Sequence, residues 1–415
     1  MSEPRGGAAD AGEIRHKTYG QIVWGQFCKD RVAVAGTAAI ALIFAMAVAA
    51  PMLANNKPFV FRDAASGETT FPLIREILAP APDVSERGLE LGFNFVLVWG
   101  VFFLLLAWPV RRLTAGLPFP RRRAVRRGAC AALFLAVLIP FLTVQPRLDK
   151  RDYKADAAAF APGGGGLAVF PPLRYGPFEQ AAGQAYKPPS AAHPMGTDSI
   201  GRDIMTRIVH GSRVSLAVGF VAVAIYLFIG VVLGALAGYY GGRTDLVISR
   251  ALEIMMGFPT FLLILTIIAV FEARSVIWVM LVLGVTGWTG VARLMRGEML
   301  KQGKMDYVTA ARAQGVPDRR IMFRHILPNA IAPVLVSATF GIAGTILTET
   351  SLAFLGLGVR PPTATWGELL NQSLANPFAY WWLLVFPGLV IFLSILSYNL
   401  AGEGLRDAID PRMRK

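Results

Sequence analysis

The chain contains 415 residues, of which 54% are hydrophobic and only 16% are charged, a composition too apolar for an ordinary soluble domain. Its net charge of +14 does not indicate nucleic acid binding, because the basic residues lie between apolar runs and no basic patch with interleaved aromatic residues is present. The composition therefore predicts a protein embedded in a lipid bilayer.

Uninterrupted apolar runs of about 20 residues predict eight membrane-spanning helices, and therefore an all-α membrane protein. The runs cover residues 32–54, 91–110, 128–144, 214–237, 246–271, 276–294, 330–353 and 381–401. Positive residues are retained on the cytoplasmic side of a membrane. The densest cluster joins the second and third runs and consists of Arg111, Arg112, Arg121, Arg122, Arg123, Arg126 and Arg127. This cluster places both termini, and the connection after the sixth run, in the cytoplasm.

The runs divide the chain into seven predicted segments. These are a cytoplasmic N-terminal segment (1–30), a first membrane helix (31–54), an extracytoplasmic loop (55–90), a helical hairpin with an arginine-rich cytoplasmic loop (91–144), a second extracytoplasmic loop (145–212), a helical core (213–401) with a cytoplasmic loop at 301–328, and a cytoplasmic C-terminal tail (402–415). The first run is predicted to be an uncleaved anchor, because about 30 mostly polar residues precede it.

The second outer loop is predicted to be irregular. It contains four consecutive glycines at 163–166 and a stretch rich in proline and aromatic residues at 171–178. Such residues favour turns and partly ordered backbone over a folded domain. Two interpretations stay open: a surface that meets a soluble binding protein or a solute, and a linker.

The end of this loop, just before the fourth run, could form a short helix capped by Thr197, Asp198 or Ser199. Its apolar face would consist of Ile204, Met205, Ile208 and Val209. We expect this helix to lie flat at the outer interface of the membrane. The alternative is a simple lead-in to the fourth membrane helix.

Ionisable residues are sparse in the predicted spans, as expected when a charge at a helix centre costs about 2.5–3.5 kcal/mol. Glu253 follows Arg250 at helical spacing, which predicts an interfacial ion pair. Glu349 lies near the outer end of the seventh run. It serves either in packing at the helix end or as a gate that contacts a solute.

Small and kink-forming residues interrupt two runs. Gly257 and Pro259 break the fifth run, and Gly341 with Gly344 forms a small-residue face on the seventh. These features suit helices that pack closely and yet rock, although they also occur in static bundles. Pro259 is therefore a candidate for either a gate or a packing role.

A polar, basic segment from Asp306 to Pro328 separates the sixth and seventh runs. Helix-forming residues extend from Tyr307 to Gln314, Gly315 follows them, and Pro317 suits the first turn of another helix. The sequence thus predicts two short helices joined at a glycine. Such an elbow can dock another protein, whereas an ordinary amphipathic cytoplasmic loop is the simpler interpretation.

This segment resembles the EAA loop of the permease subunits of ATP-binding-cassette (ABC) importers. The matching residues are Ala310, Ala311, Gly315, Ile326, Leu327 and Pro328. In that family the loop forms the coupling helix that sits in a cleft of the ATPase subunit. The resemblance implies the same role here, with Arg319 and Arg320 in the loop. Thr309 stands where the family has an acidic residue, so an ion pair from that position is not implied.

A second motif resembles the GTD..GRD element of the C-type permeases in dipeptide and oligopeptide importers. It consists of Gly196, Thr197, Asp198, Gly201, Arg202 and Asp203. Similar motifs follow at 238–245, 257–259, 354–370 and 404–412, so the resemblance covers residue 194 to the C-terminus. Residues 54–61 and 171–177 resemble a subgroup related to microcin C and peptide importer permeases. The family has six membrane helices, and residues 89–144 add a pair, which we interpret as filler helices on the outside.

The resemblance implies a multi-pass subunit of the bacterial inner (cytoplasmic) membrane that forms the path for peptides or peptide-like solutes. It also implies three kinds of partner: a second permease subunit, two ABC ATPase subunits and an extracytoplasmic solute-binding protein. The lipid bilayer is expected to surround the subunit, and no nucleic acid partner is expected. The cargo could also be nickel or another small solute, since related permeases carry these.

ATP hydrolysis is assigned to the separate subunits, because the chain lacks a phosphate-binding loop. The Gly303-Lys304 pair has Glu298 where the first glycine would stand and Met305 in place of Ser or Thr. We therefore expect a transport subunit that is not an enzyme and has no cofactor. The histidines lack metal-ligand spacing, so no metal is expected. An ion-coupled secondary carrier is the alternative, and it would show several buried acidic residues near the midplane.

Overall fold

The computed structural model describes residues 19–64, 66–81, 86–149, 151–160, 166–271 and 275–410. The first 18 residues of the predicted N-terminal segment, three of the four consecutive glycines and the last five residues of the tail lie outside these ranges. Among the described residues, seven helices are long and apolar enough to cross a membrane, and one bent pair of helices adds an eighth candidate. The all-α membrane architecture predicted from the apolar runs is therefore confirmed.

The spanning helices follow the predicted runs closely. They are α2 (Arg31–Val48), α5 (Arg87–Leu113), α6 (Phe119–Thr143), α8 (Ile204–Tyr240), α11 (Val276–Thr286) continued by α12 (Trp288–Gln302), α16 (Ala332–Phe354) and α18 (Trp381–Ile409). Helix α18 continues through much of the segment predicted to be a separate tail. A short helix, α1 (Tyr19–Phe27), precedes α2 and packs against α18.

The fifth apolar run is not one straight helix. It forms α9 (Gly242–Met256) and α10 (Thr260–Phe271), which meet at an angle of 78°. Pro259 lies at the break, where its ring disfavours the helical conformation for the preceding residue and so ends α9. The predicted interruption at Gly257 and Pro259 is confirmed, and the run is a bent pair of helices that together form one candidate span.

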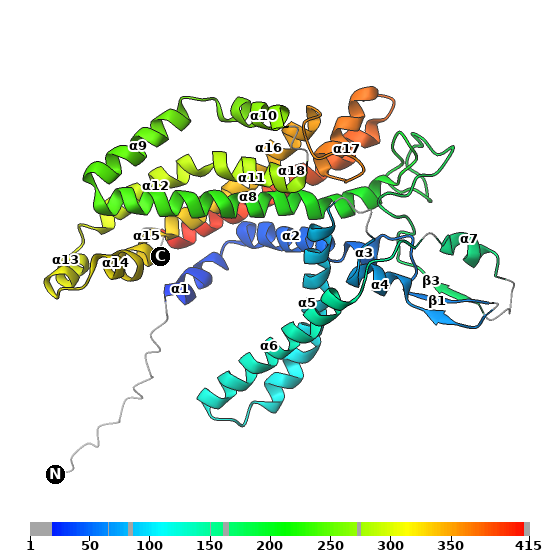
Figure 1. Cartoon of the computed structure of the whole chain (residues 1–415), viewed down its shortest axis with the longest axis horizontal. Coiled ribbons are helices and arrows are strands. Elements are labelled where there is room, and N and C mark those ends of the chain that lie inside the picture. The colour runs from blue at the N-terminus through cyan, green and yellow to red at the C-terminus, as the bar shows by residue number, and fades with distance from the viewer. Residues whose placement is uncertain are drawn as a thin grey trace, which may run out of the picture.

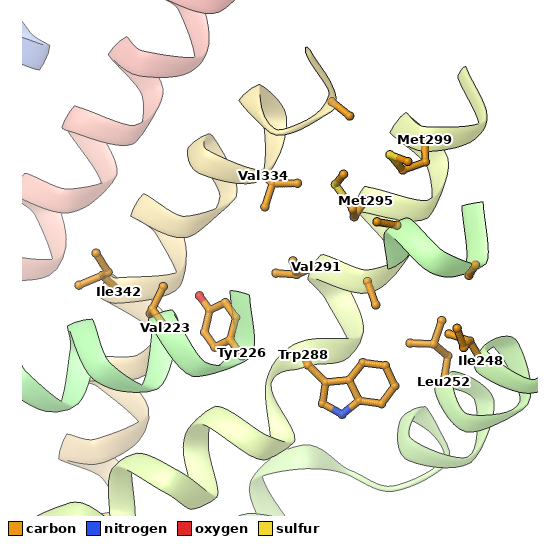
Figure 2. Close-up of a cluster of buried hydrophobic side chains, with 14 of the residues drawn as sticks. Val223, Tyr226, Ile248, Leu252, Trp288, Val291, Met295, Met299, Val334 and Ile342 are labelled. Carbon is orange, nitrogen blue, oxygen red and sulfur yellow. The ribbon is translucent and has the colours of Figure 1, made fainter. Parts of the chain in front are cut away.

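Helix α8 is the central element of the fold. Helices α12, α11, α16 and α2 pack against it, and α18 lies against α2 and α16 (Figure 1). Between these helices lies a continuous apolar core. It includes Tyr226 of α8, Trp288 and Met295 of α12, and Val334 of α16 (Figure 2). This core extends to the polar segment at 306–328, which therefore folds as part of the bundle.

Three glycines bring α8 and α12 into unusually close contact. A side chain on Gly230 would lie 2.7 Å from Cβ of Val291, and one on Gly238 would lie 2.6 Å from the Arg296 carbonyl oxygen. Between them, a side chain on Gly234 would collide with the carbonyl oxygen of Ala292. The spacing of four residues places all three on one helix face. We call Gly230, Gly234 and Gly238 the glycine seam.

The small-residue face predicted on α16 is only partly used. Gly341 makes room for the hydroxyl of Tyr226, which a side chain at this position would strike. Gly344 has no atom within 4 Å of the position that a Cβ would occupy. The close contact between α8 and α12 depends instead on the glycine seam in α8, which the sequence analysis did not identify.

The two outer loops form a small antiparallel sheet. Strand β1 (Val60–Arg62) pairs with β2 (Thr69–Thr70) and with β3 (Leu167–Val169), so that Phe61 lies opposite both Thr70 and Ala168. Phe61 is buried under Tyr153 of α7 (Tyr153–Ala158), with ring centroids 5.0 Å apart. Before α8, the described residues of the second loop contain only α7 and β3 as helix and strand, and the remainder is irregular as expected.

Helices α5 and α6 form a hairpin that projects away from the bundle (Figure 1). Two short helices, α3 (Ala50–Leu53) and α4 (Pro72–Leu78), lie at its base. There the fully buried guanidinium of Arg213 in α8 donates hydrogen bonds to Glu90 and Asn94 of α5, and to the Ala47 and Val48 carbonyls of α2. The added helices are thus fastened to the central helix by a buried ion pair.

Filling the glycine seam should loosen the bundle. We predict that Gly234→Ala lowers the thermal midpoint of the purified protein, because the added methyl group must push α8 and α12 apart at a cost of about 1–3 kcal/mol. The matched control is Gly344→Ala, which adds the same group into open space. Equal midpoints for the two variants would contradict the close contact.

Candidate functional site

The segment 306–328, which we call the elbow, has the predicted two-helix form. Helix α13 (Asp306–Ala313) is followed by Gly315 with φ +72° and then by α14 (Asp318–Arg320). The Val316 amide donates to the Ala311 carbonyl over 3.1 Å, and the Gly315 amide donates to that of Arg312 over 2.9 Å. This pair of bonds is a Schellman motif, which needs a residue in the left-handed conformation and explains the glycine.

One face of the elbow is buried in the core and the other is exposed. The buried residues are Val308, Ala311, Ile321, Met322 and Ile326. The exposed residues include Thr309, Ala310, Arg312, Gly315, Arg319, Arg320 and Pro328, while Leu327 is half-buried. The elbow is thus held against the bundle by apolar contacts and presents a basic surface outward.

The second half of the elbow is a π-helix, Ile321–Ile326, followed by α15 (Leu327–Ala330). The Leu327 amide donates to the carbonyl of Met322, five residues earlier. Pro328 has no amide hydrogen, and in a regular α-helix its ring would press on the carbonyl of Arg324. The wider turn relieves this contact, as π-bulges commonly do at functional segments.

The elbow is also bonded to the end of α8. The Tyr239 hydroxyl donates to a carboxylate oxygen of Asp318 over 2.6 Å, and the Arg312 guanidinium lies over the Tyr239 ring at 5.7 Å. Close by, Arg296 of α12 makes two hydrogen bonds of 2.5 and 2.7 Å to Asp245 at the start of α9. A displacement of the elbow therefore acts directly on α8.

The GTD..GRD motif lies at the opposite end of α8 and is mostly buried. One oxygen of Asp198 accepts from the amides of Ile200 and Arg202, and the other accepts from the Arg202 side chain at 2.5 Å. Asp203 caps α8 by accepting from the Thr206 amide over 2.7 Å. Both glycines have positive φ, and a side chain on Gly201 would strike the Ala181 carbonyl.

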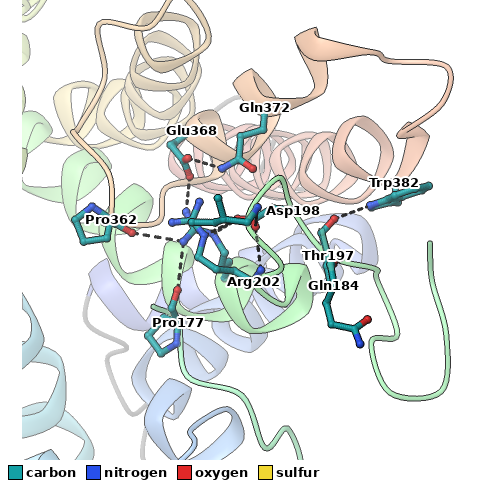
Figure 3. Close-up of polar contacts among 11 residues, drawn as sticks. Pro177, Gln184, Thr197, Asp198, Arg202, Pro362, Glu368, Gln372 and Trp382 are labelled. Carbon is teal, nitrogen blue, oxygen red and sulfur yellow. Dashed lines mark hydrogen bonds and ion pairs between the residues drawn. The ribbon is translucent and has the colours of Figure 1, made fainter. Parts of the chain in front are cut away.

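Arg207, one turn into α8, ties this motif to the chain after α16. Its guanidinium is fully buried and donates to Glu368 over 2.6 Å and to the Pro177 carbonyl over 3.2 Å. Figure 3 shows Glu368, Pro177, Asp198 and Arg202 close to one another. Its Nε lies 3.8 Å from Asp198. Glu368 belongs to α17 (Trp366–Gln372), which precedes a short 3₁₀ turn (Ser373–Ala375). We call Asp198, Arg202, Arg207 and Glu368 the polar network.

Aromatic side chains complete this end of the molecule. The Trp382 indole of α18 donates to the Thr197 carbonyl over 3.1 Å, and that of Trp366 donates to the Ile208 carbonyl over 3.2 Å. A side chain on Gly196 would meet the Trp382 ring at 2.9 Å. These bonds fix α17 and α18 to the start of α8.

His193 and Tyr175 form a stacked pair beside the cap of α8. The ring centroids are 4.5 Å apart, and His193 Nδ1 lies 2.9 Å from Asp203, to which it donates. Burial and the carboxylates of Asp203 and Glu179 raise the pKa of the Tyr175 phenol, so the phenol stays neutral. This arrangement anchors the loop that follows the outer sheet.

The structure contradicts the expected flat interfacial helix. Residues 204–209 are the first turns of α8 itself, and Asp203, rather than Thr197, Asp198 or Ser199, is the capping residue. The lead-in interpretation is correct. The motif residues therefore hold the start of a membrane helix in place, and their side chains are turned toward the protein interior.

The remaining candidates belong neither to the elbow nor to the polar network. Glu349 is fully buried in α16 and makes no hydrogen bond of regular geometry with any described residue. Pro259 is exposed at the break between α9 and α10. The predicted pair of Arg250 and Glu253 is confirmed at 2.5 Å, with both side chains largely exposed. Glu349 stays a candidate for a gate or for packing at the helix end.

Residues 230–415 match the family model of the binding-protein-dependent transport system inner membrane component, and residues 18–72 match that of the N-terminal transmembrane domain of oligopeptide transport permease C. The hairpin α5–α6 lies outside both matched ranges.

Two relatives extend the comparison. The dipeptide transport system permease protein DppC of Alkalihalophilus pseudofirmus is 43% identical over 226 residues, which are 54% of this chain and 74% of the relative. The oligopeptide transport system permease protein OppC of Haemophilus influenzae is 35% identical over 296 residues, or 71% of this chain and 88% of the relative. Among solved structures, the inward-facing MetNI methionine ABC transporter aligns with a TM-score of 0.40 and 18% identity, covering 50% of this chain and 98% of that chain.

The polar network should be essential for stability. We predict that Glu368→Gln lowers the free energy of unfolding by about 3 kcal/mol, because it leaves the Arg207 charge buried with only a distant partner. The measurement is the denaturation midpoint of the purified protein in detergent. Glu253→Gln is the control, since its exposed pair with Arg250 should contribute less than about 1 kcal/mol. A similar loss in both variants would show that the network is not special.

Proposed function

Because this chain belongs to the family of inner membrane components of binding-protein-dependent transport systems, the permease subunits of ABC importers, we propose that it forms part of a path for peptides or peptide-like solutes. The relatives named as dipeptide and oligopeptide permeases support this class of cargo. The chain is accordingly a multi-pass protein of the inner membrane. Membership in this family supports the importer and gives no support to the ion-coupled carrier.

The elbow carries the proposal for coupling. It combines an exposed basic surface, which another protein can grip, with a buried apolar face that packs in the main core. A segment that was only a solvated loop would not need five buried side chains. We assign the exposed surface to contact with a cytoplasmic ATPase subunit, and ATP hydrolysis to that subunit.

The remaining partners follow from the same proposal. Two ATPase subunits would each hold one permease, so a second permease faces this one across the path. Helices α9 and α10 are the surface assigned to this neighbour, and large apolar side chains such as Val247, Ile254 and Leu262 are exposed there. The outer sheet and the loop that follows it are the surface assigned to a soluble binding protein.

Helix α8 would transmit the motion. Its 37 residues extend over about 55 Å, from the polar network at one end to Tyr239 at the other. ATP binding would draw the elbow inward, and the bonds from Tyr239 to the elbow would turn α8 as a rigid body. The polar network would carry that rotation to α17, and the hydrogen bond from Trp382 to the Thr197 carbonyl would carry it to α18.

Reversing the charge of the elbow should prevent docking of the ATPase. We predict that Arg319→Glu together with Arg320→Glu lowers recovery of the ATPase with the permease at least about tenfold, because like charges across an interface cost several kcal/mol. Copurification of the full assembly, followed by its transport rate in vesicles, measures this effect.

The control for this experiment changes the same charge elsewhere. Arg121→Glu together with Arg243→Glu alters two exposed arginines outside the elbow. This control should copurify with the ATPase normally. If the elbow variant also binds and transports normally, the elbow is not the coupling element.

Cutting the bond between the elbow and α8 should separate docking from transport. Tyr239→Phe removes only the hydroxyl that donates to Asp318. We expect the ATPase to bind normally but transport to fall severalfold for each ATP hydrolysed, because the elbow can then move without turning α8. Tyr240→Phe is the control on the neighbouring residue, and an equal ratio of transport to hydrolysis in both variants would contradict this linkage.

A further inference from the structure

The tip of the α5–α6 hairpin carries a positive charge that the chain does not neutralise. Seven arginines lie between residues 111 and 127, and no Asp or Glu occurs between Glu90 and Asp149. Among the described residues, no carboxylate forms an ion pair with any of these arginines. Retention on one side of the membrane explains positive charge in general, but not its arrangement around a cavity.

Two adjoining cavities lie at this tip. The first, of about 280 Å³, lies between α5 and α6 and is lined mostly by apolar side chains, among them Phe103, Leu106 and Leu133. The second, of about 520 Å³, is lined by Phe119, Arg122, Arg123, Arg126, Arg127 and Cys130. Arg126 and Cys130 line both cavities, so the apolar cleft opens directly into a second cavity that is lined largely by arginine side chains.

Hydrogen bonds fix the central guanidinium without neutralising it. Arg126 donates from Nε to the Thr114 hydroxyl over 2.8 Å and from Nη2 to the Arg111 carbonyl over 3.3 Å. Both acceptors are uncharged. Beside it, the Nε of Arg122 is buried and has no hydrogen-bond partner among the described residues. The site therefore has hydrogen-bond donors and positive charge available to bind an anion.

We propose that the hairpin tip binds an anionic phospholipid. The phosphate would lie among Arg111, Arg122 and Arg126, which supply charge-assisted hydrogen bonds. An acyl chain would fill the apolar cleft between α5 and α6. A free phosphate would leave that cleft empty, and an acidic protein segment would not match its apolar lining.

The surroundings of the hairpin fit a lipid as the occupant. Helix α6 packs chiefly on α5, and Val137 is its one buried residue among those described. Its outer face carries exposed side chains such as Phe134, Leu135 and Leu142. The hairpin is thus surrounded by the lipid bilayer, and phospholipids are the molecules that contact it there. Through Arg213 and Glu90 its base is joined to α8, so a bound lipid would hold the hairpin beside the moving helix.

The test measures lipid binding to the purified full-length protein in neutral detergent, by mass spectrometry of the intact complex. Phosphatidylglycerol is the probe, phosphatidylcholine tests the need for negative charge, and glycerol phosphate tests the need for acyl chains. We expect phosphatidylglycerol to bind at least about tenfold more tightly than either, since each arginine near an anionic headgroup contributes a factor of about five.

Variants separate a built site from diffuse attraction. Arg122→Gln with Arg126→Gln should weaken phosphatidylglycerol binding at least tenfold, whereas the charge-matched pair Arg112→Gln with Arg121→Gln, outside both cavities, should weaken it less than threefold. Ala107→Phe fills the apolar cleft without changing any charge, and should also abolish tight binding.

Three results would overturn the proposal. Equal losses in the two arginine pairs would indicate diffuse attraction only. Glycerol phosphate that competes as well as the lipid would indicate a small-anion site. Unchanged binding in Ala107→Phe would show that the cleft holds no acyl chain, and a normal thermal midpoint of that variant confirms that it is folded.

Discussion

The close contact between α8 and α12 at the glycine seam is the constraint on which the rest of the structure depends. Without side chains at Gly230, Gly234 and Gly238, the two backbones approach far enough for the core to close around α8 on several sides. A helix held in this way can remain straight over 37 residues. Its two ends then lie in two different environments, the elbow at one and the polar network at the other (Figure 1). Both functional proposals for the core use this one rigid element.

Buried ion pairs position the segments beside α8 that the glycine seam does not contact. Arg207 and Arg213 are both fully buried, two turns apart on α8, and each reaches a carboxylate from another part of the chain. A buried guanidinium that loses its partner is costly, so these pairs specify which segments lie beside α8. One pair fixes α17, which belongs to the matched family region, and the other fixes the hairpin, which does not. The hairpin is therefore joined to the same helix as the core, by the same kind of interaction, a buried arginine–carboxylate ion pair.

Hydropathy correctly predicted the membrane helices, because a span requires only a local apolar composition. Gly315 predicted the turn of the elbow, because a left-handed turn favours glycine. Other features have no local signal. The strands of the outer sheet are two or three residues long, and β1 pairs with β3 across about a hundred residues. Arg207 and Glu368 are 161 residues apart. Asp203 caps α8 in preference to three neighbouring candidates because the Ile204 amide bonds to Gly196, a contact of the folded loop. The seam, by contrast, was visible as G-x-x-x-G-x-x-x-G and could have been found.

The central claim is that the elbow faces the cytoplasm while the start of α8 faces the other side of the membrane. Its most direct test is labelling of single cysteines in sealed vesicles with a membrane-impermeant maleimide, after Cys28 and Cys130 are replaced by serine. Arg319→Cys places a thiol on the exposed elbow, and Ile200→Cys places one on the exposed turn of the GTD..GRD motif. The account predicts that the first reacts only from the cytoplasmic side and the second only from the outer side. Reaction of both from one side, or with the sides exchanged, would contradict it.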